Sequence, residues 1–259
     1  MPITAPTRSA QETAPALRPL RMLSVTFTEE IAPDEIECFR GAIAEKAGLQ
    51  HERYHNHNNA PDAPSGFHYR YSLIQYQLHR RRPRILFLDD AIEDAQHFFT
   101  QSDWNLTLND RAYQTAIADL KATQCTVGST PGQFHSYRLF RWMALNEENF
   151  AKYTATAPLR DKIALLERIL SGHLLAFFTG IGMVLPQRFQ LDITHLNRVH
   201  AGSYRGIKAQ LFDIEFRADL LLPYGVGLGK GVGLGYGRLG GGEREKEQEF
   251  RRTENVDQK

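Results

Sequence analysis

The chain has 259 residues, 42% hydrophobic and 24% charged, which is the composition of a globular protein with one large domain or two ordinary ones. Its formal net charge of +1 excludes attraction of a nucleic acid by bulk charge, so such a partner would need a local basic patch. Two cysteines, Cys38 and Cys125, lack metal-ligand spacing and indicate a reduced, cytoplasmic chain.

The first half of the chain predicts a β-α-β-β-α-β order. Residues 1–19 form a flexible arm rich in Ala, Pro and Thr, without the apolar segment of a signal peptide. The expected elements follow in this order: a strand at 20–27, a helix from Pro33 to about Ala47, strands at 69–78 and 85–88 around a turn at 80–84, a helix capped by Asp89 and Asp90, and a strand at 106–108. This order is typical of a ferredoxin-like domain, which we place at 20–110.

The second half predicts the same order of strands and helices, but not every element of it is evident. Its expected elements are a strand at 136–145, a helix at 159–178 and strands at 189–196 and 208–222. Residues 111–127 fit a helix or a strand, and a second helix is not evident. We therefore predict an α+β protein with two tandem ferredoxin-like domains, the second at 111–239, and a charged, mobile tail at 240–259. No stretch is apolar for long enough to predict a membrane partner.

Glycines alternate with other residues near the end of the chain. They are Gly225, Gly227, Gly229, Gly231, Gly233, Gly235 and Gly237, with Lys230 among them. Bare backbone N–H groups beside a cation favour phosphate binding. The alternation excludes Gly-x-Gly-x-x-Gly, and the glycine after Lys230 excludes a P-loop, so no nucleotide cofactor is expected. A solvated linker is the alternative, but the apolar residues between the glycines favour an ordered segment with one face on the body.

Three histidines, His51, His55 and His57, follow the first predicted helix together with Tyr54, and Lys46 precedes them near the helix end. A solvated loop and a metal site are two interpretations, although a third metal ligand is not evident. The third is metal-free acid/base catalysis. Cleavage of RNA by its own 2′-hydroxyl needs a base, an acid and a cation for the phosphorane, and these residues supply all three.

A basic cluster, Arg80, Arg81 and Arg82, lies in the predicted turn at 80–84, and Arg238 follows the last alternating glycine. The cluster fits a solvated hairpin turn or an RNA contact equally well. His173 lies in an apolar helical pattern and is expected in the core.

Four phrases occur in a characteristic order: Phe39-Arg-Gly-Ala-Ile, Tyr54-His-Asn-His57, Tyr69-Arg-Tyr-Ser-Leu-Ile-Gln-Tyr76, and the run from Gly227 to Gly237. Together they resemble the CRISPR-associated endoribonucleases that mature CRISPR RNA, in the paired-histidine branch of the RAMP superfamily. The resemblance extends from about Leu20 to Leu239 and departs at two positions, where it would lead us to expect proline for Ser72 and lysine for Gln77.

The resemblance implies two tandem ferredoxin-like folds and a metal-independent cut in each CRISPR repeat, with no cofactor. The guide RNAs would carry 2′,3′-cyclic phosphate and 5′-hydroxyl ends. It places catalysis at His55 and His57, assisted by Lys46, Tyr54 and Tyr69. It implies RNA contacts by the glycine run, to which we add Arg238 and the cluster at 80–82.

Two other functions are compatible with the sequence. One is a non-catalytic subunit that holds guide RNA in an effector complex, and the other is a metal-dependent enzyme acting on small molecules. The expected partner is CRISPR repeat RNA, and the resemblance also allows handover to an effector complex and a homodimer. The sequence does not distinguish which of His55 and His57 is the base and which is the acid.

Overall fold

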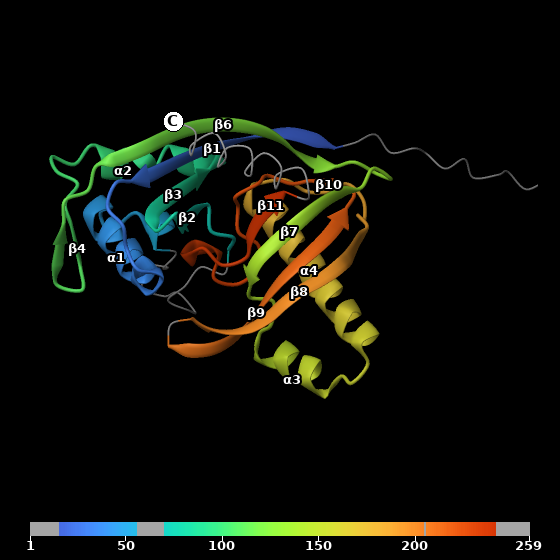
Figure 1. The fold of residues 1–259 in the computed structure, drawn as a ribbon. Coiled ribbons are helices and arrows are strands. Elements are labelled where there is room, and N and C mark those ends of the chain that lie inside the picture. Colours follow the sequence, from blue (N-terminus) through green and yellow to red (C-terminus); the bar gives the residue numbers. More distant parts are fainter. Residues whose placement is uncertain (1–15, 56–69, 205, 242–259) are drawn as a thin grey trace, which may run out of the picture.

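The computed structural model describes residues 16–55, 70–204 and 206–241, whose strands form two large sheets and one small one (Figure 1). The larger sheet has the strand order β10-β6-β1-β3-β2, the second has the order β11-β7-β9-β8, and β4 and β5 form a separate pair. The elements of the first half are β1 (Leu17–Phe27), η1 (Pro33–Glu35), α1 (Ile36–Ala47), η2 (Glu52–Tyr54), β2 (Ile74–His79), β3 (Arg82–Leu88), η3 (Asp89–Ile92), α2 (Ala95–Phe99), β4 (Leu106–Leu108), β5 (Arg111–Tyr113) and β6 (Ile117–Ser129). Those of the second half are β7 (His135–Trp142), α3 (Glu147–Ala155), α4 (Leu159–Gly180), β8 (Leu191–Tyr204), β9 (Ile207–Ala218), β10 (Leu220–Leu221), η4 (Val232–Leu234) and β11 (Arg238–Gly241).

The first ferredoxin-like fold is confirmed, but its last strand is not the predicted one. Strand β6 pairs antiparallel with β1 over the whole length of β1, giving the order β6-β1-β3-β2 with α1 and α2 in the expected places in the chain. The segment predicted to close the sheet, β4, pairs with β5 instead. A three-residue strand cannot satisfy the backbone of an eleven-residue one, whereas the thirteen-residue β6 can. The first sheet therefore extends to Ser129, beyond our predicted boundary at residue 110.

Other predicted boundaries also differ. Strand β1 begins at Leu17, inside the predicted arm, and β2 begins at Ile74 rather than residue 69. Residues 1–15 of the arm and 242–259 of the tail lie outside the described residues. Asp89 and Asp90 open the 3₁₀ helix η3 without capping it through their side chains, and α2 follows as a short helix.

Strand β3 of the first sheet is buried on both faces, since its successive side chains point to opposite sides and each side meets a core. On β3, Ile85 and Phe87 join the core under α1 and α2, whereas Leu86 and Leu88 join the core formed with α4 and the second sheet. All four are at most 5% exposed. The two halves of the chain therefore share one continuous apolar layer, and strand β10 adds a second link by pairing with β6.

The second sheet repeats the strand order of the first, with β11, β7, β9 and β8 in the places of β6, β1, β3 and β2. Helix α4 is the first helix of this fold. By length and composition alone it could cross a membrane, but its buried leucines and phenylalanines pack in the core that the two halves share. A ferredoxin-like fold has a second helix before its last strand. Here β10 and the glycine-rich segment (residues 225–237) stand between β9 and β11 instead. This explains why no sequence pattern predicted a second helix.

The glycine-rich segment lies between the two halves of the molecule, where it is drawn in red in Figure 1. The apolar residues between its glycines are buried, as the alternation predicted, and Val226 and Leu228 are fully so. Edge strand β2 binds its backbone: Gln75 Oε1 accepts from Gly227 N at 2.8 Å, and Gln77 Nε2 donates to Gly225 O at 2.7 Å. The segment is therefore an interdomain packing element rather than a linker.

Several glycines are needed because no side chain fits. A Cβ at Gly237 would lie 1.9 Å from the carbonyl oxygen of Leu228, and φ is +64° there. At Gly229, where φ is +96°, a Cβ would lie 2.7 Å from Trp142 Nε1 and 3.1 Å from His173 Nδ1. These are positions where the chain passes directly against backbone or a packed ring.

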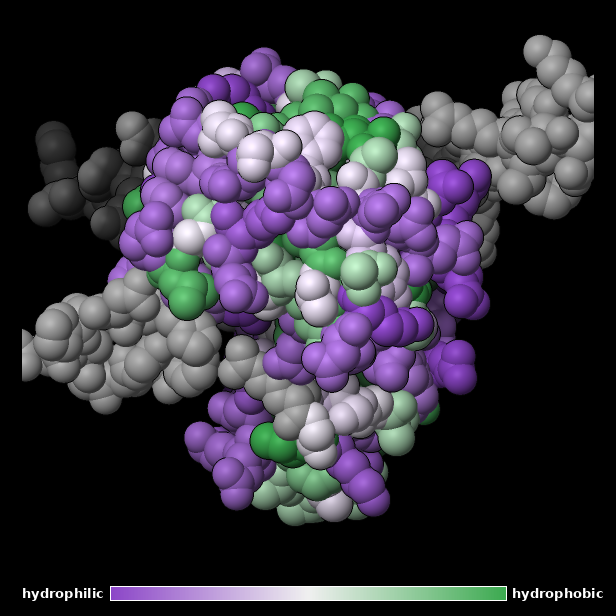
Figure 2. Space-filling model, turned by 90° about the vertical axis from the view of Figure 1, so that its left-hand side faces the viewer, coloured by the Kyte–Doolittle hydropathy of each residue, from purple (hydrophilic) through white to green (hydrophobic). Residues whose placement is uncertain are grey.

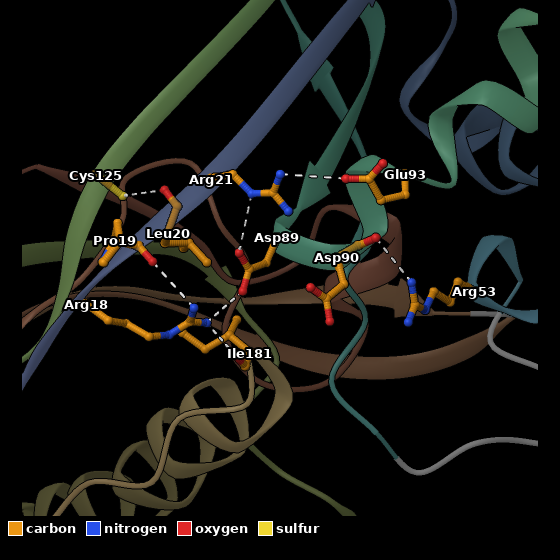
Figure 3. Close-up of polar contacts among 10 residues, drawn as sticks. All are labelled: Arg18, Pro19, Leu20, Arg21, Arg53, Asp89, Asp90, Glu93, Cys125 and Ile181. Carbon is orange, nitrogen blue, oxygen red and sulfur yellow. Dashed lines mark hydrogen bonds and ion pairs between the residues drawn. The ribbon is translucent and has the colours of Figure 1, made fainter.

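Arg18 on β1 makes a further link between the halves (Figure 3). Its guanidinium pairs with Asp89 Oδ2 at 2.8 Å and also donates to the carbonyl of Ile181, at the C-terminal end of α4. A cation at this end of a helix satisfies an orphan carbonyl and opposes the helix dipole. Asp89, with φ of +51°, is held by Arg18 and, at 4.0 Å, by Arg21.

His173 is a core residue, as predicted. Its Nδ1 accepts the indole N–H of Trp142 at 3.1 Å, and the two rings lie beside Gly229. Burial, and secondarily the nearby Lys230, lowers the pKa of His173 to about 4. The histidine therefore supports the glycine-rich segment in its neutral form.

Gly237→Ala is expected to reduce the free energy of unfolding by more than about 2 kcal/mol, because the new Cβ overlaps the Leu228 carbonyl and the left-handed backbone adds strain. Chemical unfolding monitored by circular dichroism measures this loss. The matched control is Gly172→Ala in α4, where no atom lies within 4 Å of the added Cβ and helix propensity favours alanine. Equal stability of both variants would contradict this packing.

The free energy of unfolding is expected to fall as the pH falls from 6.5 towards 4. Over this range the unfolded chain protonates His173 whereas the folded protein holds it neutral, so protons favour unfolding by at most about 3 kcal/mol. His173→Gln supplies an acceptor that does not titrate and should flatten this part of the stability curve. An unchanged slope in the variant would show that His173 is not its origin.

Candidate active site

The turn after α1 carries the candidate catalytic residues. Helix α1 ends at Gly48, whose φ is +104°, and the 3₁₀ turn η2 follows. Tyr54 is 1% exposed and fastens this turn to the domain, since its hydroxyl donates to Asp94 O at 2.6 Å. The hydroxyl of Tyr76 donates to Tyr54 O at 3.1 Å from the other side. The backbone that leads into His55 is thus held by two hydrogen bonds of Tyr54, one to Asp94 and one from Tyr76 on β2.

His55 itself is held at both its ring and its backbone. Its Nε2 lies 2.8 Å from the carbonyl oxygen of Leu49, and its own carbonyl accepts from the guanidinium of Arg40 on α1. A carbonyl oxygen can only accept, so Nε2 must carry the hydrogen of this bond. In the neutral ring the lone pair then lies on Nδ1, which makes Nδ1 the basic atom.

Two of the five predicted catalytic residues, Lys46 and Tyr54, make hydrogen bonds within the protein. The ammonium of Lys46 lies 2.7 Å from Asp103 Oδ1 and 3.0 Å from Asn105 O, so it is bound to the segment before β4. Burial raises the pKa of Tyr54, and its hydroxyl is already a donor in the core. Both side chains therefore have contacts within the protein, and their assistance in catalysis stays a prediction. His57 and Tyr69 lie outside the described residues, so the structure places neither of them.

Residues that the sequence did not single out surround the turn. The ring of His97 on α2 stacks on that of His51, with centroids 3.5 Å apart and an interplanar angle of 16°. Burial, and then His97, lowers the pKa of His51. Asp94, whose carbonyl accepts from Tyr54, pairs with Arg53 Nη1 at 2.9 Å. No local pattern could have found these contacts, because they join η2 to a helix some forty residues later.

Within the ranges that the structure describes, no group of three or more His, Cys, Asp or Glu side chains could hold a metal ion. His57, which the sequence paired with His55, is not in those ranges, so the expectation of a metal-free site stays a prediction.

The glycine-rich segment does not present its backbone as the sequence suggested. Four of its glycines use their N–H groups within the protein: Gly225 donates to Leu239 O, Gly227 to Gln75, Gly235 to Val232 O and Gly237 to Arg141 O. The expectation of bare N–H groups is therefore wrong at these four positions. That the seven glycines contact RNA stays a prediction. Lys230, by contrast, is exposed at the tip of the segment.

The predicted basic residues lie in two places. Arg80 and Arg81 form the two-residue turn between β2 and β3, both with positive φ, and Arg82 begins β3. All three are exposed, and Arg81 pairs with Glu30 at 3.1 Å. They therefore lie at the tip of a hairpin. This position is compatible both with a solvated turn and with an RNA contact.

Arg238 lies in a different basic region, beside the glycine-rich segment. With Arg141 it lines a cavity of about 150 Å³ between the two halves. Arg84 lies on β3 of the first sheet. Burial, and secondarily the charge of the nearby Arg238, lowers the pKa of Arg84 to about 10. Arg141 adopts a φ of +51°, in the strained left-handed region. The sequence predicted an RNA contact at Arg238, and the fold brings Arg84 and Arg141 to it.

Two family models match the chain: the Cas6b N-terminal domain at residues 18–126 and the Cas6b C-terminal domain at residues 129–240. The junction between them coincides with the end of β6. No curated protein sequence matches the chain significantly.

Solved structures share the fold at low sequence identity. A crystal structure of Cas6b has a TM-score of 0.71 and 20% identity, covering 86% of this chain and 99% of that one. A second, described as the CRISPR RNA processing endoribonuclease Cas6b, has a TM-score of 0.61 and 18% identity, covering 86% and 98%. Csf5, a type IV CRISPR-Cas Cas6 crRNA endonuclease, has a TM-score of 0.50 and 13% identity, covering 87% and 100%. On the two family models, which together span most of the chain, this protein belongs to the Cas6b family of CRISPR RNA-processing endoribonucleases.

Proposed function

We propose that this chain cuts CRISPR precursor transcripts within their repeats by metal-independent transesterification, with His55 and His57 as the acid/base pair. The observation that carries the proposal is the geometry of His55. Its turn is anchored through Tyr54, and its ring is oriented by the Leu49 carbonyl, as a preorganised base requires. Family membership supports the substrate class.

In this mechanism Nδ1 of His55 takes the proton of the attacking 2′-hydroxyl. The 2′-oxygen bonds to the adjacent phosphorus, the bond from phosphorus to the 5′-oxygen breaks, and His57 protonates the departing oxygen. The products carry a 2′,3′-cyclic phosphate and a 5′-hydroxyl. Because Lys46 is bound to Asp103, the cation nearest to His55 among the described contacts is Arg40, which we assign to stabilising the phosphorane charge.

The basic region around Arg84, Arg141 and Arg238 supports the binding of the repeat. Like charges gather there beside the glycine-rich segment, and no acidic residue lines the cavity. An RNA phosphate would relieve their repulsion. We infer that the RNA backbone passes over this region on its way to His55.

Cleavage of repeat RNA should persist in excess EDTA, and His55→Ala or His57→Ala should slow it by about 10²- to 10⁴-fold while leaving RNA affinity unchanged, because each removes one proton transfer. Single-turnover kinetics with labelled RNA measures the rate. His195→Ala, an exposed histidine on β8, is the control and should retain full activity. A requirement for a divalent ion, or cleavage by the double variant, would rule the mechanism out. RNA binding without any cleavage by the wild type would indicate the guide-RNA-binding subunit instead.

The tautomer of His55 gives a test that does not depend on activity. In the free protein, nitrogen-15 spectra of the neutral ring should show the hydrogen on Nε2, because the Leu49 carbonyl accepts it. His173 is an internal reference for the same tautomer, since its Nδ1 accepts from Trp142. A hydrogen on Nδ1 of His55 would exclude that nitrogen as the base and contradict the proposed mechanism.

A further inference from the structure

A groove of about 760 Å³ on the second domain is lined by none of the candidate catalytic residues. We call it the α3 groove. Its walls come from three parts of the chain: α3 with Phe150, the β8–β9 hairpin with His200, Ile207 and Lys208, and the glycine-rich segment with Lys230. Its volume is within the range of about 300–1,000 Å³ typical of small-ligand sites.

The walls of the α3 groove expose unusual apolar surface. Phe150 is 49% exposed, Val199 40% and Ile207 70%, although all three are large hydrophobic side chains. In Figure 2, hydrophobic residues interrupt the polar surface at the lower end of the molecule, where α3 and the hairpin lie in Figure 1. Apolar residues gathered in one concave surface mark a binding site more often than isolated ones do.

The polar groups of the groove indicate what kind of ligand fits. The side chains of Lys208 and Lys230 are exposed at its edge, which favours an anionic ligand. Nδ1 of His200 is buried and has no hydrogen-bond partner among the described residues. A buried polar atom left unpaired destabilises the protein, so a ligand group that pairs with it gains affinity. Glu147, at the start of α3, adds an acceptor for an amino group.

The backbone of the glycine-rich segment fixes Lys230 in this place. Lys230 N donates to Met143 O at 3.3 Å, and the flanking Gly229 and Gly231 both have positive φ. Glycine adopts positive φ readily, whereas other residues are strained there. The two glycines thus set the backbone conformation that places Lys230 at the groove.

We propose that the α3 groove is a subsite for one unpaired nucleotide of the bound RNA. The base stacks on Phe150, its edge pairs with His200 Nδ1 and Glu147, and the adjoining phosphates contact Lys208 and Lys230. The two lysines favour RNA over a second copy of this chain, because an apolar partner surface would bury both charges unpaired. This inference rests on the proposed function, since it assumes that the chain binds repeat RNA.

The test measures equilibrium affinity for fluorescein-labelled repeat RNA by anisotropy. Phe150→Ala should weaken binding about 5- to 100-fold, the loss typical of one stacked base. His200→Phe keeps a ring but loses the buried nitrogen, and it should bind more weakly than His200→Asn, which can still donate or accept. The double variant Lys208→Ala with Lys230→Ala should reduce the slope of log affinity against log salt by up to about 1.4, as expected for two lost phosphate contacts.

The control variants are Leu120→Ala and Lys121→Ala on β6, which change similarly exposed residues on the other sheet. They should leave affinity and salt slope unchanged, and all variants should unfold at the wild-type temperature. If the groove variants bind like the controls while the wild type cleaves RNA, the subsite is wrong and the proposed function stands. A change in oligomeric state with unchanged affinity would instead identify the groove as a protein interface and overturn the proposal. If the wild type neither binds nor cuts repeat RNA, the proposed function itself fails.

Discussion

The contact between strand β2 and the glycine-rich segment is the interaction on which the rest of the structure depends. Both backbone groups of Gly227 are bound by side chains of the first domain, its N–H by Gln75 and its carbonyl by Tyr71 at 2.7 Å. Gln75 is fully buried, and its amide also donates to the Tyr71 hydroxyl at 2.8 Å. Because unpaired polar groups at this depth would be costly, the network admits one register between the two halves.

The missing second helix of the second fold is what makes this contact possible. A helix keeps its backbone groups for itself and surrounds them with side chains, whereas an irregular glycine segment offers them to a neighbour. The departure at Gln77 fits this arrangement, since its amide donates to Gly225 and its oxygen accepts from Arg84. The segment therefore joins the domains, approaches the basic region around Arg238 and carries Lys230 to the α3 groove. One stretch of chain connects the two surfaces that we assign to RNA.

The candidate active site shows the same dependence on distant contacts. The sequence placed His55 beside Lys46 and Tyr54, which are near it in the chain and of suitable chemistry. In the fold, Lys46 turns to Asp103 and Tyr54 packs into the core, because the nearest partners in space come from other elements. Arg40, one of the residues that hold His55, lies in α1 some fifteen residues earlier. It belongs to one of the four characteristic phrases, but the sequence assigned it no role at the site.

The sequence by itself determined the fold class, most of the strands and helices, and the family, because hydrophobic periodicity and the order of short motifs are local properties of the chain. It left 111–127 open between helix and strand and did not predict α3. It also determined that the residues between the alternating glycines would pack on the body. Only the tertiary structure decided that β6 closes the first sheet, since pairing depends on the length of a partner strand far away in the chain. It likewise decided which glycine N–H groups are already bonded, which arginines gather at Arg238, and which nitrogen of His55 carries the hydrogen. These are properties of contacts between distant residues, and no local pattern encodes them.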